Sequence, residues 1–242
     1  MDYSHWHFSS INSTNTWPML NAHLFDREKI TLITAESQTE GKGRSNRSWI
    51  SPPVDNLYAS FCFFAPKKQQ WLGNISQIMA ITASKALESM GFHPKLKWPN
   101  DILLSGKKMG GILSEIQRQS TQVFVVVGIG MNINMSDVNL DGINRPATSL
   151  LLEGGKAVDV RKLIKQLQGE FALALPRFLK RGFSPFLSDY KKRLIHTPGQ
   201  PLLFHDKEAM QKGIFHSINR DGSLKLELES GTIKHIVTGE LC

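Results

Sequence analysis

The chain has 242 residues, 40% of them hydrophobic and 21% charged, which suffices for one large domain or for one of ~200 residues with a small companion. This composition excludes wholesale disorder, and a count of two cysteines excludes a disulfide-rich scaffold. No apolar run approaches the ~18–20 residues that span a bilayer, which excludes a protein with membrane-spanning helices. The net charge of +8 suits an anionic ligand such as a nucleotide, but also nucleic acid or an acidic protein. Because the N-terminus lacks the features of a signal peptide, we expect a cytoplasmic protein.

The first ninety residues predict strands and two helices around one long loop. Strands are expected over residues 3–10, 29–36 and 57–64, a short helix from Ser13 or Thr14 to about His23, and a polar loop over 37–53. The clearest helix covers residues 74–90, where apolar side chains recur at the i, i+3, i+4 spacing and Gly91 follows as a terminator.

The next hundred residues predict further strands and then helices. Strands are expected over 95–98, 107–117 and 122–129, the last two joined by a turn at 118–121. Asp159 is placed to cap a helix that carries apolar residues to Phe171, and Pro176 is expected to kink or end it. Ser184 and Pro185 then predict the start of a third helix that ends at about Leu194.

Beyond residue 197 the pattern changes to short strands separated by polar turns. Leu224, Leu226 and Leu228 alternate with charged residues, which is the period-two pattern of a half-buried strand. Four or five such strands predict a small β-barrel or an appended sheet over residues 197–242. The larger part, 1–196, mixes helices and strands without strict βαβ alternation, so the expected fold class is α+β rather than a doubly wound sheet.

The first of four segments suited to chemistry is the glycine-rich basic stretch 40–49. It contains two glycines, which let the backbone approach a ligand, and three cations that can fork onto phosphate or carboxylate oxygens. These residues are Gly41, Gly43, Lys42, Arg44 and Arg47. Trp49 at the end of the stretch can stack on a base. A solvated basic loop and a nucleic-acid contact are the alternatives, and the spacing is not that of a P-loop.

The second segment is Lys97-Trp98-Pro99-Asn100-Asp101. The proline favours an extended backbone before it, which leaves Asn100 and Asp101 at the end of a strand. Asp101 can hold Mg²⁺ through oxygen or accept a proton from an amine. The alternative is a plain turn, because Pro-Asn-Asp is ordinary turn chemistry.

Two further segments combine glycines with predicted strands. In residues 106–115, Lys108 comes just before Gly110 and Gly111, which indicates either a lysine held near an anion or a hairpin tip with solvated lysines. In residues 123–134, an apolar strand ends in two glycines and an asparagine, which leave room for a ligand or another backbone. These three are Gly128, Gly130 and Asn132. A Rossmann fingerprint is excluded because its third glycine is missing.

The remaining candidate groups favour structural roles. The eight histidines are scattered, and the pair His5 and His7 has no carboxylate or cysteine pattern that would complete a zinc site. Cys62 lies in an apolar run and is expected in the core, and Cys242 is terminal. No G-x-S-x-G motif is present, so nothing indicates a serine hydrolase.

Five motifs occur in a fixed order along the chain: Ser13-Thr14-Asn15, Gln38 with the 41–49 loop, Lys97-Trp98-Pro99-Asn100-Asp101, Lys108-x-x-Gly111-Ile112-Leu113, and Gly128-x-Gly130-x-Asn132. Together they resemble the biotin–protein ligase (biotin–[acetyl-CoA-carboxylase] ligase) family, from about residue 8 to the final Gly239-Glu240. The resemblance implies a class II synthetase-like, mixed-sheet domain over 1–196 that binds biotin and ATP. It also implies an SH3-like β-barrel over 197–242.

The resemblance also implies roles for single residues. The biotin-binding residues would be Ser13, Thr14, Asn15, Gln38, Gly41, Lys42, Lys108, Gly111, Gly128 and Gly130. The ATP- or adenylate-binding residues would be Arg44, Arg47, Trp49, Lys97, Asn100, Ile112 and Asn132. Among the catalytic residues, Arg44 would retain the activated intermediate and Lys108 would approach the biotin carboxylate and the α-phosphate. Asp101 would orient or deprotonate the acceptor lysine, or engage Mg²⁺.

The implied activity has two steps. ATP first converts biotin to biotinyl-5'-AMP with release of pyrophosphate, and biotin then passes to a specific lysine of a biotin carboxyl carrier protein, such as that of acetyl-CoA carboxylase. Cations are needed because a carboxylate and a triphosphate repel each other, and Mg²⁺ would offset the remaining phosphate charge. A loop that orders over the intermediate would keep out the water that hydrolyses a mixed anhydride.

The sequence departs from the family pattern in two places. Ser45-Asn46 stands where the loop often ends in glycine, which bears on the loop's grip on the intermediate. The ligase core begins almost at Met1, so the helix-turn-helix domain of repressor-type members is not expected. We therefore expect the ligase-only class without operator binding, as a monomer or as a homodimer formed through an edge strand.

Two other functions are compatible with parts of the sequence. Lipoate ligases and octanoyl transferases share a related fold, but the 97–101 motif argues against both. A basic nucleic-acid-binding protein would fit the charge and the small β-tail. However, the basic residues cluster beside glycines in a loop rather than along one helix face. Strongly salt-dependent DNA binding would support that alternative.

Overall fold

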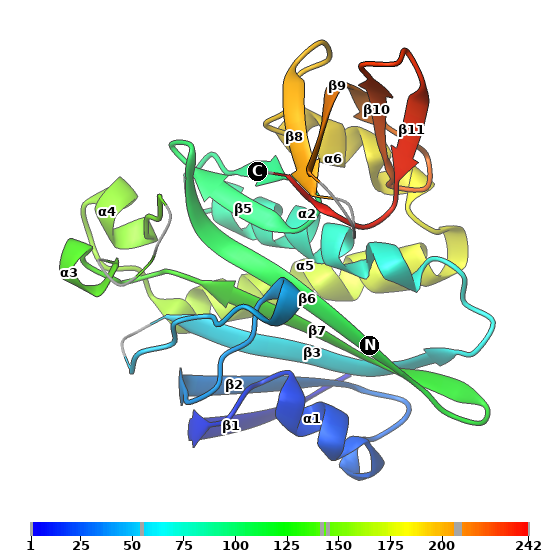
Figure 1. Ribbon diagram of the computed structural model, residues 1–242. Helices are drawn as coiled ribbons and strands as arrows, with labels where there is room; N and C mark the ends of the chain where they lie inside the picture. Colours follow the sequence, from blue (N-terminus) through cyan, green and yellow to red (C-terminus); the bar gives the residue numbers. More distant parts are fainter. Residues whose placement is uncertain (1, 54–55, 141–142, 144–145, 206–209, 242) are drawn as a thin grey trace.

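The computed structural model describes residues 2–53, 56–140, 143, 146–205 and 210–241, whose strands form two sheets (Figure 1). The larger unit comprises β1 (Tyr3–Ile11), α1 (Thr16–Leu20), β2 (Ile30–Gln38), β3 (Leu57–Pro66), α2 (Ile75–Glu88), β4 (Lys95–Lys97), β5 (Asp101–Leu104), β6 (Lys107–Arg118), β7 (Gln122–Met131), α3 (Asp137–Leu140), α4 (Leu150–Gly154), α5 (Val160–Arg181) and α6 (Leu187–Arg193). The smaller sheet comprises β8 (Pro201–His205), β9 (Met210–Ile218), β10 (Leu224–Leu228), β11 (Ile233–Ile236) and β12 (Glu240–Leu241).

The larger sheet has seven strands in the order β1-β2-β3-β7-β6-β5-β4. Strands β1 and β2 run parallel, while the other neighbours are antiparallel, so the sheet is mixed. Helices and strands do not alternate as they would in a doubly wound fold. The expected α+β class is therefore confirmed.

Two long helices, α2 and α5, cover one face of the large sheet (Figure 1). Their apolar residues meet those of the central strands, and the rings of Phe61 on β3 and Phe171 on α5 lie 4.9 Å apart, centroid to centroid. Both rings are fully buried. The apolar spacing that predicted helix 74–90 is the buried face of α2, and Asp159 caps α5 by accepting from the backbone N–H groups of Arg161 and Lys162.

The expectation that Pro176 ends its helix is wrong, while the expected kink stays a prediction. Helix α5 continues through Pro176 to Arg181. The proline lies on the exposed face, while Ala174, Leu175 and Phe178 around it are buried against the sheet. Because the buried side of the helix stays continuous, packing retains the helix although the proline lacks an N–H group.

The opposite face of the sheet carries a smaller aromatic cluster beneath α1. Trp6, Trp17 and Phe25 stack at centroid distances of 5.3 to 6.3 Å, and Phe124 of β7 lies 5.2 Å from Phe25. Helix α1 is shorter than expected, because it stops at Leu20 and is followed by a single 3₁₀ turn. The cluster covers only part of this face.

Strand β5 was not anticipated as a strand, because Pro-Asn-Asp predicted only a turn. The turn is present at residues 98–100, and Asp101 directly after it begins β5, which pairs with β4 and β6. This hairpin adds two short strands to the edge of the sheet. It also brings Asp101 opposite Gly111 of β6.

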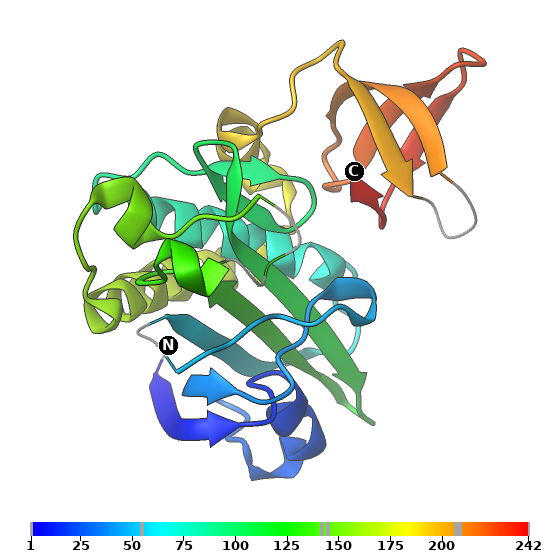
Figure 2. The same ribbon diagram turned by 60° about the vertical axis from the view of Figure 1, so that its left-hand side comes forward.

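The smaller sheet has five antiparallel strands in the order β11-β10-β9-β8-β12. Leu224 and Leu226 of β10 are fully buried and Leu228 is half-buried, which confirms the alternating pattern. Figure 2 shows this sheet beside the larger unit, joined to it by the segment that follows α6. Among the described residues, no helix is long and apolar enough to cross a membrane. Cys62 is buried as expected, and Cys242 lies outside the described residues.

Candidate functional site

A pocket of about 480 Å³ opens on the face of the large sheet that carries α1. Its floor is β7, where Phe124 and Val126 point into the aromatic cluster and Gly128 and Gly130 follow on the same face. Since side chains alternate along a strand, the two glycines leave a hollow where larger residues would have continued the cluster. The pocket is thus formed by missing side chains on a central strand.

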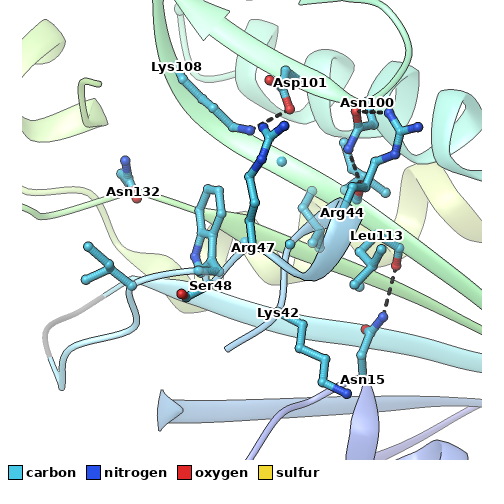
Figure 3. Close-up of a pocket in the computed structure, with 18 of the residues that line it drawn as sticks. Asn15, Lys42, Arg44, Arg47, Ser48, Asn100, Asp101, Lys108, Leu113 and Asn132 are labelled. Atoms are coloured by element: carbon cyan, nitrogen blue, oxygen red, sulfur yellow. Dashed lines mark hydrogen bonds and ion pairs between the residues drawn. The ribbon is translucent and has the colours of Figure 1, made fainter. Parts of the chain in front are cut away.

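The pocket collects nearly all the residues that the sequence singled out. Those that line it are Ser13, Thr14, Asn15, Gln38, Lys42, Arg44, Arg47, Trp49, Lys97, Asn100, Asp101, Lys108, Gly111, Ile112, Gly128, Gly130 and Asn132. Figure 3 labels ten of the lining residues and shows Arg47 and Lys108 directed toward Asp101, and Arg44 directed toward Asn100. Gly41 is the exception, and it lies behind the wall.

One end of the pocket is built on the turn between β1 and α1, where Ser13, Thr14 and Asn15 are buried. Both the nitrogen and the oxygen of the Asn15 side-chain amide are hydrogen-bonded. Its Nδ2 donates to the Leu113 carbonyl at 3.1 Å and to Glu115 Oε2 at 2.9 Å, and its Oδ1 accepts from Ser60 Oγ at 2.7 Å. An alanine Cβ at Gly128 would collide with this amide. The orientation of Asn15 is therefore fixed before any ligand binds.

Gln38, at the end of β2, ties the same turn to the loop that follows. Its Oε1 accepts from the Thr14 backbone N–H at 2.8 Å, and its Nε2 donates to Ser51 Oγ at 2.8 Å. Gly41 lies directly against the Trp49 carbonyl and accepts from the Trp49 N–H at 2.8 Å, so a side chain there would push the loop apart. The glycine thus supports the wall without facing the pocket.

The basic loop folds back on itself between Lys42 and Ser48, which form an isolated antiparallel bridge. A single 3₁₀ turn covers Arg44–Asn46. Within it Ser45 and Asn46 have positive φ values of 54° and 58°. That region favours glycine, which gives a physical reason why glycine often occurs there in the resembling family.

Trp49 closes the loop and lies over the floor of the pocket. An alanine Cβ at Gly130 would come within 2.6 Å of its Nε1, and the Lys108 ammonium lies 5.6 Å from the centroid of its ring. The indole Nε1 is buried and has no hydrogen-bond partner among the residues that the structure describes. The ring therefore lies over Gly111 of β6 and Gly130 of β7, which are paired with each other in the sheet.

The opposite wall is the 97–101 segment, which is clamped to β6. Asn100 Nδ2 donates to the Ile112 carbonyl at 2.6 Å, and the Asn100 carbonyl accepts from the Ile112 N–H at 3.0 Å. Asn100 Oδ1 accepts from Arg44 Nη1 at 3.2 Å, as Figure 3 shows. The asparagine joins the basic loop to the sheet across the pocket.

Lys108 and Asp101 form an ion pair within the pocket, with Nζ 2.6 Å from Oδ1. Both side chains are largely buried, at 16% and 19% exposure. Lys108 is therefore at a strand end facing a ligand space and not at a solvated hairpin tip. Such partly buried pairs interact more strongly than surface pairs because the surrounding dielectric is lower.

Asn132 sits just beyond β7 and fixes the segment that precedes α4. Its Nδ2 donates to the Thr148 carbonyl at 3.1 Å. Thr148 Oγ1 in turn donates to Glu153 Oε1 at 2.7 Å, and Ser105 Oγ donates to the other oxygen of Glu153. These two hydrogen bonds lower the pKa of the Glu153 carboxyl.

The charge of the pocket is strongly positive. Lys42, Arg44, Arg47, Lys97 and Lys108 line it, and Asp101 is the one carboxylate among the described lining residues. No group of three or more His, Cys, Asp or Glu side chains within the described part of the chain is placed to hold a metal ion. His5 and His7 instead share the Thr34 hydroxyl at 2.7 and 2.9 Å. The pocket is suited to a ligand with several negative charges.

Sequence reasoning missed several residues of the site. Ser60 and Glu115 hold Asn15 but lie in strands without any motif that marks them. Leu241, on the two-residue strand β12, lines the pocket from the smaller sheet. No sequence pattern could have placed it there, because its position depends on how the two sheets pack.

Comparison with known proteins gives consistent matches. The chain matches the biotin/lipoate A/B protein ligase family over residues 7–132. The bifunctional ligase/repressor BirA of Salmonella typhimurium is 34% identical, over 91% of this chain and 70% of that protein. The biotin--[acetyl-CoA-carboxylase] ligase of Paracoccus denitrificans is 28% identical, over 82% of this chain and 85% of its own length. The structure of the biotin protein ligase from Aquifex aeolicus in complex with biotin and ATP superposes with a TM-score of 0.82 and 25% identity, covering 99% of this chain and 97% of that chain.

Proposed function

The chain belongs to the biotin/lipoate A/B protein ligase family and is a biotin ligase, and we propose that it attaches biotin to a protein lysine in two steps driven by ATP. The observation that carries the proposal is the pocket with five cations and one carboxylate over a floor of glycines. The cations suit a carboxylate and a triphosphate, and the narrow glycine floor suits a compact apolar ring system.

In the first step a biotin carboxylate oxygen attacks the α-phosphorus of ATP. A new O–P bond forms, the bond from the α-phosphorus to the bridging oxygen breaks, and pyrophosphate leaves with the electron pair. Lys108 is assigned to the carboxylate and the α-phosphate, and Arg44 and Arg47 to the phosphate oxygens. Cations at these places lower the repulsion between the two anions and stabilise the charge that develops on phosphorus.

In the second step the neutral amine of an acceptor lysine attacks the acyl carbon, and AMP leaves. The lysine must lose a proton before or during attack, and Asp101 is assigned to orient or accept from it. The contact between Asp101 and Lys108 supports this role, because a ligand anion that draws Lys108 away leaves the carboxylate available.

Mg²⁺ fits the pocket as a companion of the triphosphate. Asp101 is the one carboxylate among the described lining residues, and one or two carboxylates with substrate phosphates and water are a usual Mg²⁺ environment. Asp101 would be its protein ligand, and the bound ion would offset phosphate charge. Within the described part of the chain, no cluster of three or more His, Cys, Asp or Glu side chains would surround the ion.

The two ends of the pocket receive different parts of the substrates in this proposal. Biotin is assigned to the end formed by Ser13, Thr14, Asn15, Gln38, Lys42, Gly111, Gly128 and Gly130, with its carboxylate toward Lys108. Gly41, which was expected to bind biotin, is assigned to the support of the wall behind them. ATP and the adenylate are assigned to Arg44, Arg47, Trp49, Lys97, Asn100, Ile112 and Asn132. The 41–49 loop would close over the intermediate and exclude water.

The proposal also covers the acceptor protein, the cellular location, the oligomeric state and the domains of the enzyme. The acceptor would be a biotin carboxyl carrier protein in the cytoplasm, and the enzyme would be a monomer or a homodimer. Residues 1–196 would form the catalytic domain, and residues 197–242 an SH3-like domain. The basic residues are assigned to the pocket rather than to a nucleic-acid surface, so operator binding is not part of the function proposed here.

The test is biotin-dependent exchange of labelled pyrophosphate into ATP by the purified protein, with lipoate and octanoate as parallel acids. We expect exchange with biotin and none above background with the other two. Exchange with lipoate instead would contradict the biotin assignment. A folded protein that exchanges with none of the three acids in the presence of Mg²⁺ would overturn the adenylation step itself.

A further inference from the structure

The turn between β9 and β10, residues 219–223, docks on the larger unit through two of its backbone carbonyls. Asn74 Nδ2 donates to the Asp221 carbonyl at 2.8 Å. Gln77 Nε2 and Trp98 Nε1 both donate to the Gly222 carbonyl, at 2.9 and 3.1 Å. One carbonyl oxygen of the smaller sheet therefore receives two side-chain donors from the larger unit.

The donors are buried where the turn meets them. With the turn in place, Gln77 is 4% exposed and Trp98 is 2% exposed, so neither donor is open to water. Asn74 Nδ2 also donates to Gln77 Oε1 at 2.7 Å, which orients the Gln77 amide with its Nε2 toward the turn. Buried donors of this kind are costly to leave unpaired, so the contact is specific.

The turn is equally fixed on its own side. Asp221 Oδ1 accepts from the Ser223 N–H at 3.0 Å and from Ser223 Oγ at 2.6 Å, and Asn219 Nδ2 donates to Ser223 Oγ at 2.9 Å. These side chains are thus engaged within the turn, and its carbonyls make the contact with the larger unit. Gly222 has φ +78°, and an alanine Cβ there would collide with the amides of Asn74 and Gln77.

Trp98 belongs to the segment that forms one wall of the pocket. The next polar residue, Asn100, accepts a hydrogen bond from Arg44, and Asp101 pairs with Lys108. On the small-sheet side, Leu241 of β12 lines the same pocket. The smaller sheet therefore reaches the site at two points, with the docked turn on Trp98 of this wall and Leu241 at the pocket itself.

We propose that the docked turn, through Asn74, Gln77 and Trp98, positions the nucleotide end of the pocket. These three are positioning residues, because they act through the 97–101 wall and through the placement of Leu241. The inference rests on the proposed function for its assignment of the two pocket ends. The biotin end is held separately, since Ser60, Glu115 and Ser51 fix Asn15 and Gln38.

The test compares Gly222→Ala with Gly231→Ala in the full chain. Both glycines have positive φ, +78° and +76°, but a Cβ at Gly231 would meet no atom within 4 Å. Both variants therefore place an alanine at a positive φ and lose a similar amount of folding free energy, but only Gly222→Ala disturbs the docked turn. We expect the KM for ATP in pyrophosphate exchange to rise about tenfold or more in Gly222→Ala alone, with the KM for biotin within about twofold.

A second variant guards against a folding defect. Gln77→Glu keeps the size of the side chain but replaces the donor to the Gly222 carbonyl with an oxygen, and we expect the same selective rise in the KM for ATP. If Gly222→Ala matches Gly231→Ala, or if both KM values rise equally, the inference is wrong. If the unaltered protein shows no biotin-dependent exchange, the proposed function has failed instead, so the two outcomes are distinct.

Discussion

The Lys108 ammonium lies 2.6 Å from Asp101 Oδ1, across two neighbouring strands of the sheet edge. In the ligand-free pocket each of these charges is balanced by the other. An entering carboxylate or phosphate must compete with Asp101 for the lysine, and the residue it displaces is the one assigned to the second step. In the proposed reaction, binding of the anionic substrates would therefore release Asp101 from Lys108 before the acceptor lysine arrives.

Lys108→Ala should abolish the adenylation step. Removal of a cation aimed at a developing oxyanion typically costs about 10²–10³ in rate, and we expect a loss of that size in biotin-dependent pyrophosphate exchange. Lys107→Ala is the matched control, because Lys107 is the neighbouring exposed lysine on the same strand. Exchange that is unaffected in Lys108→Ala would reject the assignment of this lysine.

Asp101→Asn should slow transfer more than activation. The amide keeps the size of the side chain but does not accept the lysine proton, so single-turnover transfer from preformed biotinyl-5'-AMP to the acceptor should fall about 10²-fold or more. Pyrophosphate exchange is expected to fall less. An equal loss in both assays would indicate that Asp101 acts in the first step, through Lys108 or Mg²⁺.

Arg44→Gly should release the activated intermediate. The change removes both the cation and its hydrogen bond to Asn100 from the basic loop. We expect the adenylate to leave the pocket and to label lysines of bystander proteins such as serum albumin, measured by biotin blotting. Lys67→Gly, an exposed basic residue after β3, is the control that should stay selective. A strictly acceptor-specific Arg44→Gly enzyme would show that the loop does not retain the intermediate.

Gly128→Ala should weaken biotin binding. The new Cβ would displace the Asn15 amide from its hydrogen bonds with Leu113 and Ser60. Overpacking typically costs about 1–3 kcal/mol, so the KM for biotin should rise about 5- to 150-fold. Gly169→Ala, on α5, is the control because a Cβ there meets nothing within 4 Å. A KM for biotin that stays at the unaltered value would remove Gly128 from the proposed binding site.

His196 should make the fold sensitive to mild acid. It is 8% exposed. Burial, together with the positive charge of nearby Lys97, lowers its pKa from 6.5 to about 4, and the opposing effect of Gln200 is smaller. Between those values the unfolded chain binds a proton that the folded chain excludes, so stability falls as pH drops below about 6.5. Between about pH 7.5 and about pH 5, the Tm of His196→Gln should fall by about 4–8 °C less than the Tm of the unaltered protein. If thermal scans show the same loss of Tm in both proteins, His196 does not cause the acid sensitivity.

Local patterns predicted most of the fold because they depend on nearby residues alone. The spacing of apolar residues in α2, the cap at Asp159 and the alternation in β10 each follow from one face of one element being buried. Pro176 was misjudged because its effect depends on which face of α5 meets the sheet. Strand β5 was missed because four residues after a proline turn give too little pattern to distinguish a strand from a loop.

The sequence identified the motifs of the site, but it did not identify the residues that hold those motifs in position by hydrogen bonds. Arg44 and Asn100 could be named from sequence, while their hydrogen bond across the pocket requires the loop and the hairpin to be placed in space. Ser60 and Glu115 orient Asn15 from strands that are far away in the chain. Their identity as supports follows from the register of β3, β7 and β6, which short motifs do not encode.

The floor of the pocket is also the middle of the sheet, where β7 is hydrogen-bonded along its length to β3 and β6. A strand paired on both sides is among the last parts of a protein to open by local fluctuation. In the proposed binding mode, the acid would lie on a strand that has little freedom to move, and the 41–49 loop and the 97–101 wall would make the adjustments during turnover. To accept a larger acid, such an enzyme would need substitutions in the central strands of the sheet. Those substitutions would also lower the stability of the fold, so substrate size and stability are linked.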